Sequence, residues 1–285
     1  MLLIQDQNAE VGSRGFRGIR RWYMRNGKLD VRGFKNDWNK SSAYINSALS
    51  DFEALFGVMG KRYLPFSPMV VTYAGILHYF QEVKHYAHDK EKRIRQKLKK
   101  WYWVSVIGQR YKAGTNSVIR KDYQLLKDWI APGAHKTPSR FMPKMTEEEI
   151  ERLIGRTRSG ADAVYRAVVC LPHLKQKCDI YSGQPYCSSP LDDHHIYPRK
   201  RLRDSGCDED DINQVSNRVL TCKRAHWPLR CDWPWKHFKT VSRQLLRGYY
   251  IPEDIVEGKP RFREFIRYRR ASLAKRVASL VKNGV

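Results

Sequence analysis

Four side chains in the second half of the sequence have the types and spacing that hydrolysis of a phosphodiester requires. His194 and His195 stand side by side within Leu191–Pro198, Asn217 opens a short apolar segment, and His226 follows it. Such hydrolysis needs a divalent cation on a phosphate oxygen and a general base that takes a proton from the attacking water. Paired histidines followed by a third can supply both. The pattern therefore predicts a metal-dependent nuclease site.

The geometry of a strand separates the roles of the two adjacent histidines. Successive side chains of a strand point to opposite faces, so we expect His194 on the metal and His195 facing the substrate as general base. An imidazole with its ordinary pKa near neutrality can accept a proton from water. An amide cannot, so Asn217, the second expected catalytic residue, is predicted to hydrogen-bond across the hairpin and hold His195 in register.

Three residues are expected to hold the cation: His194, His226 and Asp193. Mg²⁺ prefers oxygen ligands, whereas imidazole nitrogens favour softer cations. We therefore expect Mn²⁺, Ni²⁺ or Zn²⁺ to serve at least as well as Mg²⁺. The opposing interpretation, a polar hairpin that binds no metal and belongs to a non-catalytic nucleic-acid-binding subunit, stays open at this point.

The remaining histidines need no chemical explanation. The chain has nine histidines in 285 residues. An isolated histidine is usually a surface or core residue, despite the many roles that its side chain can take. We place six of them in that class: His78, His85, His88, His135, His173 and His237.

The charge balance indicates a polyanionic partner. Lysines and arginines number 54 against 29 acidic residues, which gives a formal net charge of +25, and 12% of the residues are aromatic. Phosphate neutralisation by such a protein supplies DNA affinity, and nothing resembles an RNA-stacking sheet motif. A basic surface that only keeps the protein soluble is the alternative. The expected DNA contacts, proposed to line one groove, are Lys97, Lys99, Lys100, Arg199, Lys200, Arg201, Arg267, Arg269 and Arg270.

Neither a membrane protein nor a secreted one is expected. No apolar run approaches the roughly 18 residues of a spanning helix, and Met1–Ile4 leads straight into polar residues without a secretion signal. Six cysteines do not form a secreted disulfide framework, so we expect a cytoplasmic protein. Two pairs of cysteines flank the site, Cys178 with Cys187 and Cys222 with Cys231, and eight residues lie between the members of each pair. This spacing is wrong for a zinc knuckle. We expect buried free thiols, not structural zinc, at Cys178, Cys187, Cys222 and Cys231.

A helical body is expected to position the site. Apolar residues recur at three and four positions from Phe34 to about Ile130, which predicts a bundle of amphipathic helices in a domain over 34–145, preceded by an N-terminal segment, 1–33. Thr146, with Glu149 three residues later, predicts a helix start. The second domain therefore spans 146–285.

Within this second domain, the sequence predicts the elements around the hairpin. An apolar helix over 161–171 should pack under it, and Asp208–Asp211 should form a polar loop between its strands. Arg199 and Arg201 should lie in a loop just past Pro198. A C-terminal helix over 260–281 should seal the core with one apolar stripe and present arginines around it.

The order of these residues resembles that of the HNH endonucleases, in which an adjacent pair ends the first strand of a ββα hairpin. The chain also resembles the C-terminal nuclease half of the GmrSD-type proteins, which act in modification-dependent restriction or phage defence. Their HNH-like motif reads Asp-His-Ile-Phe-Pro, where this chain has His194–Pro198. Three further segments resemble that half, and the resemblance spans roughly 34–281: Trp103–Tyr111, Asn213–Leu220 and Phe265–Arg270.

This resemblance implies a fold, a reaction and a partner. The expected fold is mainly α, a helical bundle with an inserted ββα-metal hairpin of the HNH type. The family's metal-binding Asp falls on His194, its general base on His195, its strand Asn on Asn217 and its helix Asn or His on His226. The imidazole of His194 departs from the family's carboxylate. A ParB-like nucleotide-hydrolysing partner is implied as well, because this chain lacks that half's Asp-Gly-Gln-Gln-Arg motif.

Overall fold

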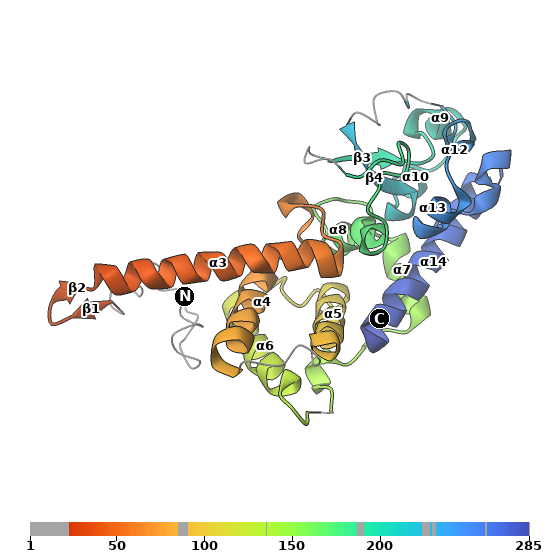
Figure 1. The fold of residues 1–285 in the computed structure, drawn as a ribbon. Coiled ribbons are helices and arrows are strands. Elements are labelled where there is room, and N and C mark those ends of the chain that lie inside the picture. The colour runs from red at the N-terminus through yellow and green to blue at the C-terminus, as the bar shows by residue number, and fades with distance from the viewer. Residues whose placement is uncertain are drawn as a thin grey trace. The chain divides into compact units, whose positions relative to one another are not determined.

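The fold is mainly α, as the sequence predicts, with two small antiparallel sheets of two strands each among the described residues (Figure 1). None of the helices in this described part has both the length and the hydropathy needed to cross a bilayer. The chain divides into two compact units, one of residues up to Phe52 with Phe66–Met142, the other of Glu53–Pro65 with Pro143–Val285. The computed structural model describes residues 23–84, 91–134, 136–186, 191–223, 229, 232–259 and 261–284.

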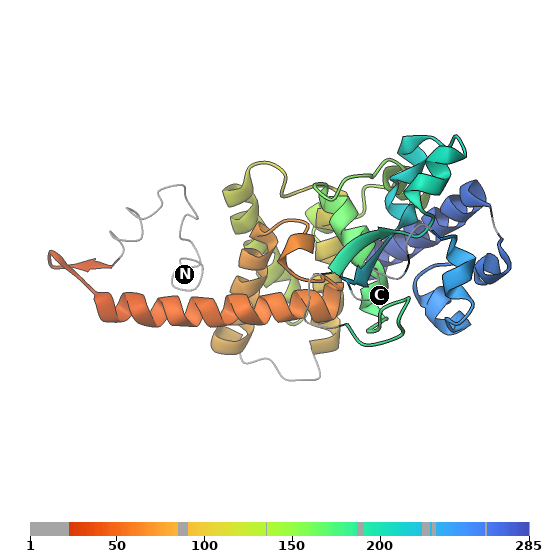
Figure 2. The same ribbon diagram turned by 90° about the horizontal axis from the view of Figure 1, so that it is seen from above.

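The first unit is built on one long helix, α3, which follows a small β-hairpin (Figure 2). The hairpin pairs Met24 with Leu29 around a turn in which Asn26 and Gly27 both have positive φ. Such a turn suits a tight two-residue connection between antiparallel strands. The elements of this unit are β1 (Met24–Arg25), β2 (Lys28–Leu29), α3 (Val31–Phe56, ending in the second unit), α4 (Pro68–His78), η2 (Tyr79–Lys84), α5 (Glu91–Ile107), α6 (Thr115–Ile130) and η4 (Ser139–Phe141).

A buried carboxylate organises the core of this unit. Asp122 on α6 is fully buried and accepts hydrogen bonds from the indole of Trp101 and the hydroxyl of Tyr111, both at 2.9 Å. The guanidinium of Arg110 pairs with the same carboxylate. A buried charge is tolerated when it is paired and hydrogen-bonded in this way. The segment Trp103–Tyr111 therefore has a structural role here, at the end of α5 and just beyond it.

The second unit carries the expected site and combines short helices with the second sheet. The predicted capping box is confirmed, because Thr146 and Glu149 bond each other's backbone N–H groups at the start of α7. The loop predicted over 208–211 is wrong: Asp208 caps a short helix, α10. The elements are η1 (Lys61–Tyr63), α7 (Glu147–Gly155), α8 (Ala163–Cys170), η5 (Leu171–Leu174), β3 (Leu191–His195), α9 (Arg199–Asp204), α10 (Glu209–Ile212), η6 (Val215–Asn217), β4 (Arg218–Cys222), α12 (Pro234–Phe238), α13 (Arg243–Gly248), η8 (Glu253–Glu257) and α14 (Phe262–Asn283).

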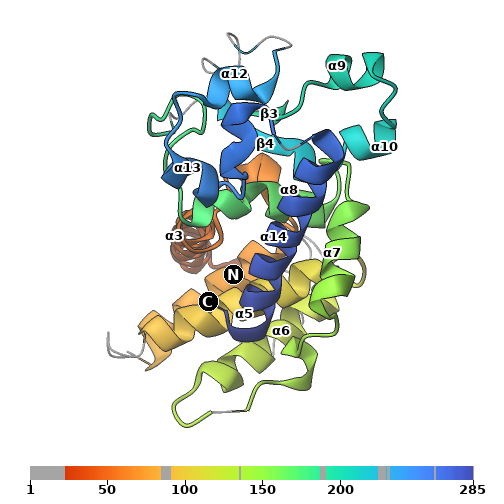
Figure 3. The same cartoon turned by 90° about the vertical axis from the view of Figure 1, so that its right-hand side faces the viewer.

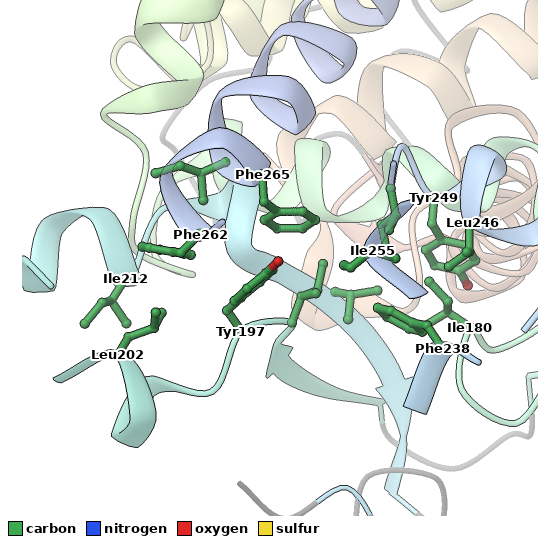
Figure 4. Packing of buried hydrophobic residues seen from close by; sticks show 14 residues of the cluster. Ile180, Tyr197, Leu202, Ile212, Phe238, Leu246, Tyr249, Ile255, Phe262 and Phe265 are labelled. Atoms are coloured by element: carbon green, nitrogen blue, oxygen red, sulfur yellow. The ribbon is translucent and has the colours of Figure 1, made fainter. Parts of the chain in front are cut away.

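An aromatic and aliphatic core supports the hairpin in this unit. The ring of Tyr197, two residues beyond β3, packs against Phe262 and Phe265 of α14, with centroids 5.6 Å and 4.9 Å away (Figure 4). Helix α14 runs alongside α7 (Figure 3). The predicted C-terminal helix is thus confirmed, and its apolar stripe is buried at Phe265, Leu273 and Val277.

Residues Glu53–Pro65, which the sequence places within the helical domain 34–145, group with the second unit instead. At Gly57, φ is +72°, and an added Cβ would come within 2.9 Å of the carbonyl oxygen of Cys170. Only glycine combines that backbone conformation with so close an approach at little cost. No apolar periodicity could reveal such a contact, because it depends on backbone and not on side chains.

A buried histidine makes the stability of this unit dependent on pH. His173 is 1% exposed, and neither ring nitrogen has a hydrogen-bond partner among the described residues. Burial, followed by the charge of Lys177, lowers the pKa of His173 to about 3. In the unfolded chain its pKa is about 6.5, so the unfolded state binds the extra proton between these values. Its neutral form therefore supports folding fully above pH 6.5, and this support is lost as the pH falls.

Replacing His173 with Met, which is similar in volume, should remove this pH dependence. From pH 7 to pH 5 the wild type should lose about 2 kcal/mol more unfolding free energy than His173→Met, since each pH unit costs about 1.4 kcal/mol per proton. Urea unfolding at both pH values measures the difference. Parallel losses in the two proteins would show that the pKa of His173 is the same in the folded and unfolded states.

Candidate active site

The paired histidines lie on the first strand of an antiparallel hairpin. Strand β3 pairs with β4 in a register that sets Leu191 opposite Cys222 and His195 opposite Arg218. His195 is the last residue of β3. Because strand side chains alternate between faces, Asp193 and His195 share one face of the hairpin and His194 lies on the other.

The face of Asp193 and His195 carries a cluster of polar side chains, which we call the polar face: Tyr165, Asp193, His195, Asn213 and Arg218. The Arg218 guanidinium lies at its centre. Its Nε donates to Asp193 Oδ1 and to the hydroxyl oxygen of Tyr165, each at 2.9 Å. Its Nη1 lies 2.5 Å from Nδ1 and 2.6 Å from Nε2 of His195.

Two further contacts complete the polar face. The Tyr165 hydroxyl donates to Asp193 Oδ2 at 2.6 Å, so both carboxylate oxygens accept hydrogen bonds. Asn213 Oδ1 lies 3.1 Å from His195 Nε2 and accepts a hydrogen bond from it in the tautomer that protonates Nε2. The polar face is therefore fully connected, and the imidazole of His195 is in contact with both a cation and an amide.

Burial and the charge of Arg218 keep His195 neutral. Burial, followed by the Arg218 charge, lowers the pKa of His195 to about 4, against smaller opposing effects of Asn213 and Asp193. Burial lowers the pKa of Arg218, but the Asp193 carboxylate and the Tyr165 hydroxyl outweigh this effect, so the pKa of Arg218 is raised. The expectation of a near-neutral pKa for His195 is thus wrong for this arrangement. The imidazole is therefore neutral at pH 7, as a proton acceptor must be, although it is a weaker base than an ordinary histidine.

The expected metal ligands are not gathered within the described residues. His194 contacts the ring of Tyr181 edge-on at 5.4 Å, on the opposite face from Asp193. His226 lies outside the residues that the structure describes. No group of three His, Cys, Asp or Glu side chains suited to a metal ion occurs in the described part of the chain. The described donors alone do not form a metal site.

Asn217 holds the backbone that connects the two strands. It is fully buried at the end of η6, and β4 starts one residue later than the sequence predicts. Its Oδ1 accepts from the Tyr197 N–H at 2.9 Å, and its Nδ2 donates to the carbonyl oxygens of Tyr197 at 3.1 Å and Ile212 at 3.0 Å. The amide thus bridges the returning chain to the residues just after His195.

Arg269 was expected to contact DNA, and the structure shows that this prediction is wrong. Its side chain is 1% exposed, and Nη1 donates to the carbonyl oxygens of Ser216 and Arg218, both at 2.8 Å. Its Nε donates to the Tyr249 carbonyl oxygen at 3.2 Å. Burial lowers its pKa to about 10, so it stays charged at pH 7. Arg269 therefore fixes the backbone on both sides of Asn217 and has no surface left for a phosphate.

The remaining expected DNA contacts occur in both units. In the second unit, Arg199 pairs with Glu209 at 3.0 Å, and Arg270 pairs with Glu151 at 3.0 Å. Arg199, Lys200 and Arg201 lie on the short helix α9, not in the predicted loop. Arg267 is exposed on α14. The single groove that would join them to the first unit stays a prediction.

The three expected lysines of α5, in the first unit, are all partly buried. Lys97 Nζ donates to the carbonyl oxygens of Trp129 at 2.5 Å and Ala134 at 2.8 Å. Its ammonium is therefore already engaged in structure. Lys99 and Lys100, on the same helix, are half-buried, and burial lowers the pKa of Lys100.

Two of the four cysteines that flank the site, Cys187 and Cys231, lie outside the described residues. Cys178 is half-buried and Cys222 is buried. The expectation about structural zinc at this set therefore also lies outside the described residues.

Sequence reasoning missed three members of the polar face. Tyr165 lies on α8, an apolar helix whose core packing hides a functional hydroxyl in the sequence pattern. Asn213 and Arg218 stand within the segment Asn213–Leu220, but only the strand register brings Arg218 opposite His195. The signal that the sequence offered was the place of Arg218, directly after Asn217 at the start of the second strand.

The sequence is distantly similar to an archaeal protein. No protein-family model matches the sequence. The chain is 24% identical over 220 residues to an uncharacterised protein of the archaeon Methanocaldococcus jannaschii. The alignment covers 69% of this chain and 35% of the relative. The chain thus spans about a third of the length of the relative it matches.

Proposed function

We propose that the chain is a metal-dependent DNA endonuclease of the HNH type, with His195 as general base. The observation that supports this most strongly is the setting of His195, a half-buried neutral imidazole at the end of β3 with a carboxylate and a guanidinium on the same face. In this proposal β3 and β4 are the two strands of the ββα-metal hairpin, and Asn217 holds them in register. The helix that would carry His226 falls largely on residues outside those described.

His195 would act on the attacking water. As the bond from the water oxygen to phosphorus forms, the neutral imidazole takes the water proton. The bond from phosphorus to the leaving sugar oxygen breaks, and that oxygen takes a proton from solvent. A divalent cation, with His194 and His226 as its proposed ligands, would polarise a phosphate oxygen. Asp193 would not share that ion with His194, because the two side chains lie on opposite faces of β3.

The charge and the resemblance set the proposed biological role. A net charge of +25 favours DNA as the substrate. The GmrSD-type resemblance over 34–281 favours restriction or phage defence in the cytoplasm. The chain would act there alone or with a ParB-like nucleotide-hydrolysing partner.

Supercoiled plasmid tests this proposal. The purified chain should nick or linearise plasmid in at least one of Mg²⁺, Mn²⁺, Ni²⁺ and Zn²⁺, and EDTA should abolish cleavage. With nitrogen ligands in the site, the last three metals should work at least as well as Mg²⁺. Plasmid that is bound but uncut in every metal would contradict the endonuclease and favour the alternative, a non-catalytic nucleic-acid-binding subunit that works with a partner.

Helix α9 should contribute to DNA binding through Arg199 and Arg201. With about five to eight phosphate contacts, log K should fall against log salt with a slope of roughly −4 to −7. Replacing both arginines with glutamine should flatten that slope by one or two units. Fluorescence anisotropy with a labelled duplex measures it. The control, Arg243→Gln with Arg247→Gln, removes the same charge from α13. If this control flattens the slope equally, the change reflects overall charge and not a DNA contact at α9.

A further inference from the structure

We propose that Arg218 binds the scissile phosphate, and that in the free chain Asp193 and His195 hold this arginine in place until DNA arrives. The inference rests on the proposed nuclease function and adds a catalytic residue and a closed resting state to it. The ligand it assigns to Arg218 is a phosphodiester.

The strand register places Arg218 where a substrate must come. It stands directly opposite His195, in the last pair of the hairpin before the chain leaves β3 for the connecting segment 196–217. A water positioned by His195 would lie about 3 Å from the ring, and the attacked phosphorus about 3–3.5 Å further on. The guanidinium is already 2.5–2.6 Å from that ring. A phosphate within reach of the water is therefore also within reach of Arg218.

The chemistry of Arg218 suits this ligand. A guanidinium is always charged and offers a planar fork that matches two phosphate oxygens. Nε is occupied by Asp193 and Tyr165, while Nη2 makes no hydrogen bond to the part of the chain that the structure describes. Arg218 is the member of the polar face whose charge is opposite to that of DNA.

The same contacts close the site when DNA is absent. The side chains of Arg218 and Asp193 are only 17% and 16% exposed, so each charge needs a partner. A DNA phosphate supplies Arg218 with a replacement anion, and the Tyr165 hydroxyl continues to hydrogen-bond Asp193. Movement of Arg218 to the phosphate would uncover the ring nitrogens of His195. DNA binding would therefore open the site that then acts on it.

Binding in EDTA tests the phosphate contact separately from cleavage. Each lost phosphate contact changes the slope of log K against log salt by about 0.9. Arg218→Gln should flatten the slope for a labelled DNA duplex by about one unit. The control, Arg247→Gln, removes an equal charge from an exposed pair with Glu253 and should leave the slope unchanged. An unchanged slope in Arg218→Gln would overturn the proposal.

A charge-conserving variant tests the geometry of the fork and guards against misfolding. Arg218→Lys keeps a cation beside Asp193 but not two parallel donors. It should retain the wild-type melting temperature and salt slope, yet cleave plasmid at least about tenfold more slowly. Cleavage at the wild-type rate would overturn the assignment of Arg218 and leave the endonuclease standing. If the wild type itself never cuts but Arg218→Gln flattens the slope, the endonuclease fails and the phosphate contact holds.

Discussion

Replacing His195 with alanine should slow DNA cleavage by about 10²- to 10⁴-fold, which is the usual worth of a positioned general base, and should leave DNA affinity nearly unchanged. The reason lies in what the variant keeps. Arg218 retains its hydrogen bonds to Asp193 and Tyr165, so the charge of the polar face is preserved. Only the acceptor for the water proton is lost. Single-turnover cleavage of supercoiled plasmid in the best metal measures the change.

A second histidine variant separates chemistry from stability. His78 is buried in the first unit, where its ring packs edge-on against Tyr44 at 5.4 Å. His78→Ala should lower the melting temperature but leave cleavage by the folded protein near the wild-type rate. Residual cleavage by His195→Ala within about tenfold of the wild type would remove His195 from the role of general base.

The sequence predicts the elements of the second unit well where the pattern is local. The capping box at Thr146 needs only two residues three positions apart, and the apolar helix under the hairpin, α8, only a mostly apolar run of residues. Alternation along β3 correctly separates His194 from His195. Each of these features depends on neighbours in sequence, which is why a single chain reveals them.

Arg269 shows how a correct pattern can be misread. Its position falls on the apolar stripe of α14, between Ile266 and Leu273, and not on the exposed side with Arg267. A charged residue on such a stripe is buried only if it is fully hydrogen-bonded, and here three carbonyl oxygens accept from it. The helical period alone could have placed Arg269 inside the core. Its partners could not be predicted, because they come from distant segments.

The polar face itself could be predicted only in part. Asp193 and His195 are two residues apart on one strand, but Tyr165 comes from α8 and Asn213 from the region just before η6. Joining them requires the register of β3 and β4 and the packing of α8, both of which are long-range. The low pKa of His195 follows from its burial and from the charge of Arg218, which the same register brings opposite it, and could not be predicted either.

Replacing Asn217 with alanine should lower the free energy of unfolding by about 3 kcal/mol, because buried groups left without partners cost about 1–3 kcal/mol each. The variant would orphan the N–H and carbonyl of Tyr197 and the carbonyl of Ile212, in a site that admits little water. Cleavage should fall less than in His195→Ala, because the amide positions the strand that carries His195 and takes no proton. Urea unfolding and single-turnover cleavage measure the two effects.

Asn213 offers a matched control four residues earlier. It is only part-buried, and its amide contacts His195 and the side chain of Glu209. Asn213→Ala should therefore cost less than about 1 kcal/mol in stability, since water can replace the lost partners. If Asn217→Ala instead unfolds like the wild type but loses as much activity as His195→Ala, then Asn217 contacts the substrate. The backbone around residue 217 would then be held by Arg269, through the carbonyl oxygens of Ser216 and Arg218, together with the pairing of β3 and β4.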